Sequence, residues 1–571
     1  MTAAQSHSSL QVEPLSETGN HSWVPIAIAS LGAAVLIYWT SAGKTLWVDE
    51  EMLGLNVRFR PLSSFWGPLW LNQAAPLGWM FVERLILMTL GTGERAARLL
   101  TTVFGVATLA TAAWIGRRWM SSVGACILVA LCASGEWMVF FTLELKHYSG
   151  DTFFALLLPA LAARALERAD ESDSTSRRVT IWWLAASIGM WFSNGAVFVT
   201  PACAVILIAI LWRRRGWRIA FHASLPGGLW VASFALIYAI ELRHAAANAY
   251  LKEYWSFAYP PTPRGLSATL SWWWKQLGPF AVKPGGCQLG IWLWVLWTAG
   301  VLFPIGTRRT LALMFATVPL SAVALATAHV VPTFERLALW VVPALYVGVA
   351  LSGDTGAALV PRFVSRGRAA LGLAGPALLM LAAFVVCADV VRQGEVALEA
   401  RTTRSNYGLD DRSSIRWLLA AHVPGDLVAT THFGLAGLWW YSAANISDVD
   451  RSTHLADGSP LYELGHVPAE GNCDQARNEM ADALRGHRRV VVYLGFRMNV
   501  LPVGFDDFVM AELSRRGALV GFKSFADLSR IAIFDLRQAP DSAGAFPTFS
   551  RETVTPPTIP GCVTLTPARR W

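Results

Sequence analysis

Residues 23–41 read WVPIAIASLGAAVLIYWTS, a stretch without a charged side chain that is long enough to cross a bilayer core as a helix. Apolar blocks of comparable length recur along the chain. The 571 residues are 54% hydrophobic and 15% charged, against roughly 25% charged residues in soluble domains. This composition excludes a soluble enzyme, a disordered chain and a small disulfide scaffold. It predicts a polytopic α-helical membrane protein.

The apolar blocks predict eleven membrane spans. They are residues 23–41, 96–116, 122–142, 152–166, 181–195, 196–212, 222–241, 290–306, 310–330, 336–352 and 371–389. A further apolar segment, residues 76–90, is interrupted by Glu83 and Arg84. We expect it to lie in the membrane interface as an amphipathic helix.

Lys and Arg set the predicted orientation, because short cytoplasmic loops are enriched in both. Basic clusters mark one side of the membrane, at residues 117–118, 164–178, 213–218, 308–309 and 362–368. The loops on the other side are longer and more dilute in charge, at residues 42–95, 143–151, 242–289 and 331–335. The tail 1–22 lacks Lys and Arg while Lys44 follows the first span, a local signal that the five downstream loops outweigh. We therefore expect a cell-membrane protein with a cytoplasmic N-terminus, a first span kept as a signal anchor, and an extracytoplasmic C-terminal part.

The pattern from residue 390 to residue 571 changes to that of a small α/β domain. Amphipathic helices are predicted at 413–423 and 475–487, and strands at 427–432, 489–496, 518–524 and 530–537, the last two as a hairpin. Residues 538–571 read as an extended closing strap. Cys473 and Cys562 fall in this part, and both a disulfide between them and two free thiols stay open.

The segment TLWVDEEMLGLN, residues 45–56, places three consecutive acids just after the first span: Asp49, Glu50 and Glu51. Charge at a membrane surface is costly, so such residues indicate function. A carboxylate at the mouth of a helical bundle is a candidate general base towards a hydroxyl. The alternative is a solvated acidic loop.

Three other segments on the predicted outer side are also unusual: LNQAAPLGWM (71–80), FTLELKHYSGD (141–151) and VPTFERLALWVVP (331–343). The second concentrates Glu144, Lys146, His147, Tyr148 and Asp151 within a short connection. The third opens a span with Arg336, which either reaches towards the headgroups or binds an anionic phosphate.

These motifs together resemble the GT-C superfamily of membrane glycosyltransferases, in the bacterial branch of protein mannosyltransferases and the lipid A aminoarabinose transferase. The W-x-D-E setting is matched by Trp47, Asp49 and Glu50, and the Gln-then-Pro-Leu-aromatic stretch by Gln73, Pro76, Leu77 and Trp79. The E-x-x-x-R-L entry is matched at 94–99 and the E-L-K-x-Y-S-x-D connection at 144–151. The resemblance covers residues 23–400 in topology and is specific mainly at 45–155.

The resemblance implies an inverting glycosyltransferase that moves a sugar from a polyprenyl phosphate to an acceptor at the outer face. The catalytic candidates are Asp49 as the base, with Glu50 and Glu144. The candidates for the donor phosphate are Lys146, Arg58 and Arg336, and those for other substrate contacts are Gln73, His147, Tyr148 and Asp151. One departure is Ala75, where several relatives place a phosphate-binding Lys.

The implied partners are the polyprenyl-phosphate sugar donor, an acceptor that is a lipid, a glycan or a protein, and the membrane itself. The net charge of +8 comes largely from the predicted cytoplasmic arginines and does not indicate nucleic acid. No cofactor is indicated, and a divalent metal stays open because members of the superfamily differ. The alternative functions are a transporter or flippase of a lipid-linked or envelope substrate, and an assembly protein. Charges at one face and the lack of an internal repeat favour the enzyme.

Overall fold

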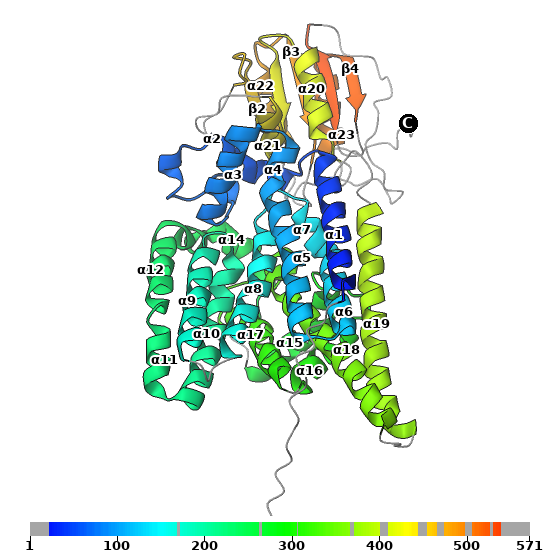
Figure 1. Cartoon of the computed structure of the whole chain (residues 1–571). Helices are drawn as coiled ribbons and strands as arrows, with labels where there is room; N and C mark the ends of the chain where they lie inside the picture. The colour runs from blue at the N-terminus through cyan, green and yellow to red at the C-terminus, as the bar shows by residue number, and fades with distance from the viewer. Residues whose placement is uncertain are drawn as a thin grey trace, which may run out of the picture.

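The computed structural model describes residues 22–167, 172–261, 265–304, 306–365, 370–399, 409–442, 454–464, 473–496, 505–525 and 529–537. A bundle of helices forms the larger part, and a small α/β domain lies at one end of it (Figure 1). Four short helices lie where the two parts meet: α2 (Val48–Phe59), α3 (Leu77–Leu90), α4 (Glu94–Ala97) and α21 (His432–Tyr441). This architecture confirms the predicted fold class.

The bundle consists of membrane-spanning helices. Among the described residues, eight helices are long and apolar enough to cross a membrane: α1 (Val24–Ser41), α5 (Leu99–Trp119), α8 (Tyr148–Leu166), α10 (Asn194–Arg215), α11 to α13 (Trp217–Ala247), α17 (Thr307–Thr327), η5 with α18 (Glu335–Val360) and α19 (Ala374–Glu399). The pair α6 (Ser122–Ser134) and α7 (Glu136–Thr142) is bent by 53° and adds a ninth if it is counted as one span. The chain is thus a multi-pass membrane protein.

Two of the eleven predicted spans fall on helices that do not meet the length and composition of a full membrane span. Residues 181–195 fall mostly on α9 (Ser172–Gly189), whose first turns carry the polar sequence SDSTSRR. Residues 290–306 contain α16 (Ile291–Leu302), whose 12 residues rise only about 18 Å. Neither helix passes as a full span by length and composition. A helix is present at the predicted segment 76–90, as α3, and its position in the membrane interface stays a prediction.

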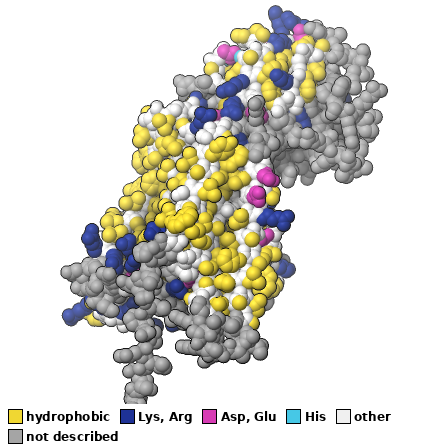
Figure 2. Space-filling model, turned by 45° about the vertical axis from the view of Figure 1, so that its right-hand side comes forward, with side chains coloured by type: hydrophobic (Ala, Val, Ile, Leu, Met, Phe, Trp, Pro, Cys, Tyr) yellow, Lys and Arg dark blue, Asp and Glu magenta, His cyan; other side chains and the backbone are white. Residues whose placement is uncertain are grey.

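The flanks of the bundle carry apolar side chains that face outwards. Examples from four helices are Leu31 (68% exposed), Val205 (66%), Leu320 (60%) and Leu381 (57%). Figure 2 shows hydrophobic side chains covering much of the visible flank. Apolar surface of this extent is stable in contact with lipid rather than water.

The bundle end opposite the C-terminal domain is held by one buried carboxylate. Asp354 of α18 (Val342–Ser365) accepts a hydrogen bond from the Ser121 amide at 2.7 Å and pairs with Arg308 Nε at 3.0 Å. Arg308 Nε also donates to the Trp119 carbonyl. These contacts link the end of α5, the start of α17 and the middle of α18. The helix ends that carry Arg117 and Arg213 lie at this same end of the bundle.

The C-terminal domain, residues 409–537 as far as they are described, contains a five-stranded mixed sheet of order β2-β1-β3-β5-β4. The strands are β1 (Leu427–Thr430), β2 (Leu461–Glu463), β3 (Arg489–Leu494), β4 (Ala518–Ser524) and β5 (Arg530–Asp535). β1 runs parallel to β2 and β3, and β5 runs antiparallel to β3 and β4. Its other helices are α20 (Asp411–Ala421), α22 (Cys473–Leu484) and α23 (Phe505–Ser514).

The predicted strands at 427–432, 489–496, 518–524 and 530–537 are all present, and β4 and β5 form the predicted hairpin. The short strand β2 and the helices α21 and α23 were not predicted. The domain boundary predicted at residue 390 falls inside α19 (Ala370–Glu399), which continues the last span without a break. The strap 538–571, Cys562 and residues 1–21 lie outside the described residues.

Helix α2 is packed between the two parts of the molecule. A Cβ atom at Gly54 would lie 2.8 Å from the Trp440 ring of α21 and 3.2 Å from the Leu145 side chain. Only glycine therefore permits both neighbours to approach α2 this closely. Trp440, Leu53 and Leu145 belong to one buried apolar cluster, which the C-terminal domain and the bundle share.

Candidate active site at the domain-facing end of the bundle

The first turn of α2 aims its acids in three directions. The Trp47 amide, just before the helix, donates to Glu50 Oε2 at 2.7 Å and fixes the start of the helix. Successive residues of an α-helix are rotated by about 100°. Asp49, Glu50 and Glu51 therefore meet different neighbours, although they are adjacent in the sequence. Their position in the first turn is favourable for negative charge.

Asp49 faces the bundle and pairs with Arg336 of η5 (Glu335–Val341). Asp49 Oδ2 lies 3.1 Å from Arg336 Nη2, and the two side chains are 26% and 31% exposed. Burial disfavours the charged carboxylate, but Lys146 and Arg336 together hold the pKa of Asp49 below its ordinary value. Asp49 is therefore ionised at neutral pH and remains accessible.

The guanidinium of Arg336 is held by aromatic side chains. Its central carbon lies 5.7 Å from the centre of the Trp255 ring, a cation–π distance. The Tyr148 side chain also lies beside Arg336. Trp255 was not among the predicted site residues, because nothing in the sequence connects it with an arginine 81 positions later.

Lys146 is the second cation beside Asp49. Its Nζ donates to Gln73 Oε1 at 2.8 Å, and the residue is 6% exposed. Burial lowers the pKa of Lys146, and the charge of Asp49 acts against that effect. The structure thus brings together Asp49, Lys146, Arg336 and Gln73, four residues that the sequence predicted as site residues. These four residues are called the acid–base cluster below.

Glu50, unlike Asp49, is buried and fully hydrogen-bonded within the protein. Its two oxygens accept hydrogen bonds from Arg98 Nε and Nη2, at 2.8 and 2.6 Å, and from the Leu145 amide at 2.6 Å. The side chain is fully buried. Because its acceptors are occupied by fixed donors, Glu50 anchors the 143–147 connection to α2. Its predicted catalytic role, to orient the base or the acceptor, stays a prediction.

Glu144 lies on that same connection and is 2% exposed. Its charge acts on three cations, namely Arg98, Lys146 and Arg336. Glu144 is therefore part of the electrostatic surroundings of the acid–base cluster. Its burial indicates a role in balancing the cations.

His147 and Asp151 point away from Asp49 towards helix α10. Asp151 Oδ1 accepts hydrogen bonds from Ser193 Oγ at 2.8 Å and the Gly195 amide at 2.9 Å, at the start of α10. His147 Nε2 lies 3.2 Å from Asn194 Nδ2. Burial, with a contribution from Lys146, lowers the pKa of His147 to about 3, so the ring is neutral. The contacts of Asp151 hold the start of α10, and the prediction that both residues contact substrate stays a prediction.

Tyr148 lies between these two groups. Its ring packs against Phe141 and His147, with centroids 4.9 and 4.6 Å apart. Through Arg336 it borders the acid–base cluster. Among the four residues predicted for other substrate contacts, Gln73 and Tyr148 are the two that reach this cluster.

Arg58 is not brought to the acid–base cluster. It lies nine residues after Asp49 on the same helix, a rise of about 13 Å. Its Nη1 donates to the Trp440 carbonyl at 2.8 Å, and its guanidinium packs on the Trp440 ring. Arg58 thus links α2 to the C-terminal domain, and its predicted role as a phosphate ligand stays a prediction.

Glu51 faces the C-terminal domain and meets a second acid. It is fully buried and faces Asp411 of α20, whose Oδ1 accepts a hydrogen bond from the Tyr493 hydroxyl. Burial and the facing charge raise the pKa of Glu51 well above its ordinary value, and burial raises that of Asp411 to about 7. Two carboxyls that face each other in a buried site do not both ionise, so the pair retains one proton.

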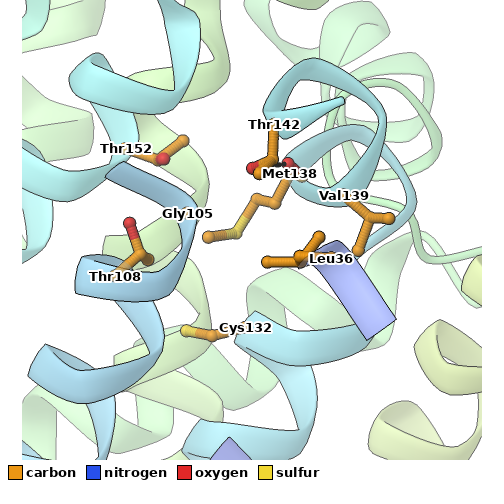
Figure 3. A pocket seen from close by; sticks show the side chains of 8 residues that line it. All are labelled: Leu36, Gly105, Thr108, Cys132, Met138, Val139, Thr142 and Thr152. Carbon is orange, nitrogen blue, oxygen red and sulfur yellow. Dashed lines mark hydrogen bonds between the residues drawn. The ribbon is translucent and has the colours of Figure 1, made fainter. Parts of the chain in front are cut away.

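A small cavity inside the bundle does not match a substrate site. It is lined by Leu36, Gly105, Thr108, Cys132, Met138, Val139, Thr142 and Thr152 (Figure 3). Its volume of about 10 Å³ holds about one water molecule. The hydroxyls of Thr108, Thr142 and Thr152 already donate to backbone carbonyls. Among the described residues, no group of three or more His, Cys, Asp or Glu side chains is placed to hold a metal ion.

Two solved structures share this architecture over almost their whole length. They are ArnT from Cupriavidus metallidurans in the apo state and the same protein bound to undecaprenyl phosphate. Both are 12% identical and cover 90% of this chain, with 99% and 98% of their own chains covered and TM-scores of 0.52 and 0.51. No protein-family model matches the sequence, and no curated protein matches it. The chain thus has the fold of the ArnT structures, which confirms the resemblance at the level of fold.

Proposed function

We propose that this protein is an inverting glycosyltransferase that moves a sugar from a polyprenyl-phosphate donor to an acceptor hydroxyl. The observation that carries the proposal is the meeting of Asp49 with Arg336, at 3.1 Å, beside the buried Lys146. These residues come from three distant parts of the chain. They supply a carboxylate and two cations at one accessible end of the bundle.

In the proposed reaction, the carboxylate of Asp49 accepts the proton of the acceptor hydroxyl. The hydroxyl oxygen attacks the anomeric carbon of the donor sugar from the face opposite the phosphate. The bond between that carbon and the phosphate oxygen breaks, and the polyprenyl phosphate leaves with the electron pair. Arg336 and Lys146 stabilise the negative charge that develops on the leaving phosphate.

The lipid nature of the donor is supported by the fold. The ArnT structure of this fold contains undecaprenyl phosphate, a polyprenyl phosphate. The cations of the acid–base cluster lie at the end of a bundle whose flanks are apolar. A donor with its chain in the bilayer and its phosphate at headgroup depth suits this arrangement. The acceptor is a lipid, glycan or protein that approaches from the same end.

The orientation of the protein follows from its charges. Basic helix ends lie at the end of the bundle away from the C-terminal domain. Because short cytoplasmic loops are enriched in Lys and Arg, that end faces the cytoplasm in this proposal. The acid–base cluster and the C-terminal domain then lie on the extracytoplasmic side, where a flipped lipid-linked sugar is available.

The test is sugar transfer by the purified protein in lipid vesicles, with an undecaprenyl-phosphate sugar as donor. Asp49→Asn keeps the size and the hydrogen-bonding capacity of the side chain but cannot accept a proton. We expect it to reduce the transfer rate by about 10²- to 10⁴-fold, the usual contribution of a general base. Intact folding is checked by an unchanged thermal unfolding curve.

The matched control is Asp457→Asn. Asp457 is a carboxylate of the C-terminal domain that pairs with His422 at 2.7 Å. The Asp457→Asn variant removes one negative charge outside the acid–base cluster and is expected to leave the rate of sugar transfer unchanged. Wild-type protein that moves the intact lipid-linked sugar across the vesicle membrane without transferring it would instead indicate a flippase. Full transfer by Asp49→Asn would show that Asp49 is not the base.

A further inference from the structure

The contact between Asp49 and Arg336 occupies the two groups that the reaction needs separately. A base must be free to accept a proton, and a phosphate ligand must offer its donors to the phosphate. In the structure Asp49 Oδ2 and Arg336 Nη2 are 3.1 Å apart, so each is directed at the other. Both side chains are partly exposed, which leaves room for an incoming group to compete.

The charges around this contact are balanced. Among the described residues named above for this region, three acids face three bases: Asp49, Glu50 and Glu144, with Arg98, Lys146 and Arg336. Glu50 and Arg98 are committed to each other in a buried pair. A phosphate that enters adds negative charge, which is stabilised only if a cation shifts its contacts from a carboxylate to the phosphate.

Arg336 is the cation best suited to such a shift. Lys146 is buried and already donates to Gln73. Arg336 is more exposed and rests on the face of Trp255, a contact that does not fix the direction of its N–H groups. A guanidinium has five N–H donors in a planar fork, so a small rotation redirects it from one anion to another.

We propose that Arg336 is exchanged between Asp49 and the donor phosphate, so that binding of the donor releases the base. This inference rests on the proposed function. In the empty protein Arg336 holds Asp49 as an ion pair that is a poor base. When the lipid-linked donor binds, its phosphate takes Arg336, and Asp49 turns to the acceptor hydroxyl. Donor binding thus activates the base, and the acceptor is deprotonated only when a donor is present.

The exchange has a consequence for protonation. Asp49 is faced by Arg336 of η5, Lys146 of the connection, Tyr148 of α8, and Tyr250 of α14 (Ala249–Tyr254). In the structure the cations hold the pKa of Asp49 below its ordinary value. When the phosphate neutralises Arg336, that pKa rises, and the carboxylate becomes a stronger base.

The first test is binding of undecaprenyl phosphate, without a sugar, to the purified protein in detergent. If Asp49 competes with the phosphate for Arg336, Asp49→Asn binds undecaprenyl phosphate more tightly than the wild type, by about tenfold. Arg336→Gln binds it more weakly by a similar factor. In the Arg336→Gln background, Asp49→Asn brings less than about a twofold gain, because no shared cation is left.

The Asp457→Asn variant serves again as control for the loss of one negative charge and is expected to bind like the wild type. Equal or weaker binding by Asp49→Asn would overturn the exchange, as would an equal gain in both backgrounds. Asp49→Ala is a second variant with the same expected direction. These measurements need no turnover, so they are informative even if sugar transfer, and with it the proposed function, is not observed.

The second test uses the wild type and its pH–rate profile with an undecaprenyl-phosphate sugar. The acid limb of kcat/KM reports the empty protein, and that of kcat reports the donor complex. If Arg336 is exchanged between Asp49 and the phosphate, the acid limb of the kcat profile lies at higher pH than the acid limb of the kcat/KM profile. In Arg336→Gln the two limbs coincide, and in Arg336→Lys they stay separate. Coincident limbs in the wild type would overturn the inference while leaving the transferase activity established.

Discussion

Asp49 and Glu51 lie two residues apart on α2, and the protein uses them in opposite ways. Asp49 faces the bundle, is 26% exposed, and meets cations that lower its pKa. Glu51 faces the C-terminal domain, is fully buried, and meets Asp411. One carboxyl is therefore kept charged and available, while the other shares a proton. The difference shows that the partner on each side of the helix, and not the acidic residue itself, determines the chemistry.

Glu50 lies between Asp49 and Glu51 in the sequence and provides a third environment for a carboxyl. It is as buried as Glu51, yet it is charged, because Arg98 supplies a bidentate partner at 2.6 to 2.8 Å. The three acids thus represent three ways of placing a carboxyl: an exposed ion pair, a buried ion pair and a buried shared proton. The variants below test these assignments, beginning with the largest expected effect.

Arg98→Met leaves Glu50 charged and buried without its cation. We expect a loss of about 3–5 kcal/mol in the free energy of unfolding, as is typical when one partner of a buried pair is removed. The measurement is thermal unfolding in detergent. The double variant Glu50→Gln, Arg98→Met removes both charges and recovers part of this loss. Equal stability of Arg98→Met and the wild type would show that Glu50 does not depend on Arg98.

The pair of Glu51 and Asp411 makes stability depend on pH. The pKa of Asp411 is raised from its ordinary 3.8 to about 7 in the folded protein, so the folded state binds more protons than the unfolded state between these values. Stability from this pair is present at low pH and is lost as the pH rises towards 7. The expected slope is up to about 1.4 kcal/mol per pH unit for one proton.

The measurement compares unfolding temperatures of the wild type and Asp411→Asn between pH 5 and pH 8. Asparagine donates a hydrogen bond to Glu51 without a titrating proton, so the difference between the two proteins should fall with rising pH and then level off. A difference that does not change with pH would mean that Asp411 does not titrate in this range and that its pKa is not raised to about 7.

Gly437 tests how closely the two carboxyls are enclosed. A Cβ atom at this position would lie 2.2 Å from Asp411 Oδ2 and 3.1 Å from Glu51 Oε2. Gly437→Ala is therefore expected to cost about 1–3 kcal/mol, the usual range for overpacking. Gly228→Ala in α12 (Gly227–Ile237) is the control, since nothing lies within 4 Å of its Cβ. Equal unfolding temperatures for the two variants would contradict the tight enclosure.

Trp255→Leu gives the smallest effect and concerns the Asp49 side. It removes the aromatic face under Arg336, a contact of about 0.5–1 kcal/mol at a partly exposed site. We expect the KM for the lipid-linked donor to rise by about two- to fivefold with little change in kcat. Trp255→Phe keeps an aromatic face and should retain most of the affinity. A large drop in kcat would show that Trp255 does more than support Arg336.

The sequence alone predicts much of the fold, because hydropathy and period are local properties. The long apolar blocks become helices, and strands such as β3 and β5 follow from runs of β-branched residues. Two features of the fold are not predicted by hydropathy and period. Strand β2 has three residues, which is too short for a period to be seen. α9 carries its polar residues at one end, so that only part of it is apolar.

The candidate site was predictable in part. Asp49 and Lys146 lie in segments dense in charge, and Arg336 opens an apolar span, so each attracts attention separately. Their mutual distances, and the burial of Glu50, depend on contacts between residues far apart in the chain. Arg98 illustrates the difficulty: its motif was noted, but its pairing with Glu50 requires the tertiary fold. Nothing in the sequence marks Asp411 as a partner of Glu51, since an acidic residue near the start of a helix usually serves as a cap.

The insertion of Trp440 against Gly54, with the shared apolar cluster around it, has a consequence for how the chain can be divided. A protein truncated after α19 would lack the C-terminal residues that pack on one side of α2. Leu53, Glu51 and their neighbours would then be exposed to water. The membrane part is therefore not a self-sufficient module to which a soluble appendage is attached. The last third of the chain completes the packing around α2, the helix that carries Asp49.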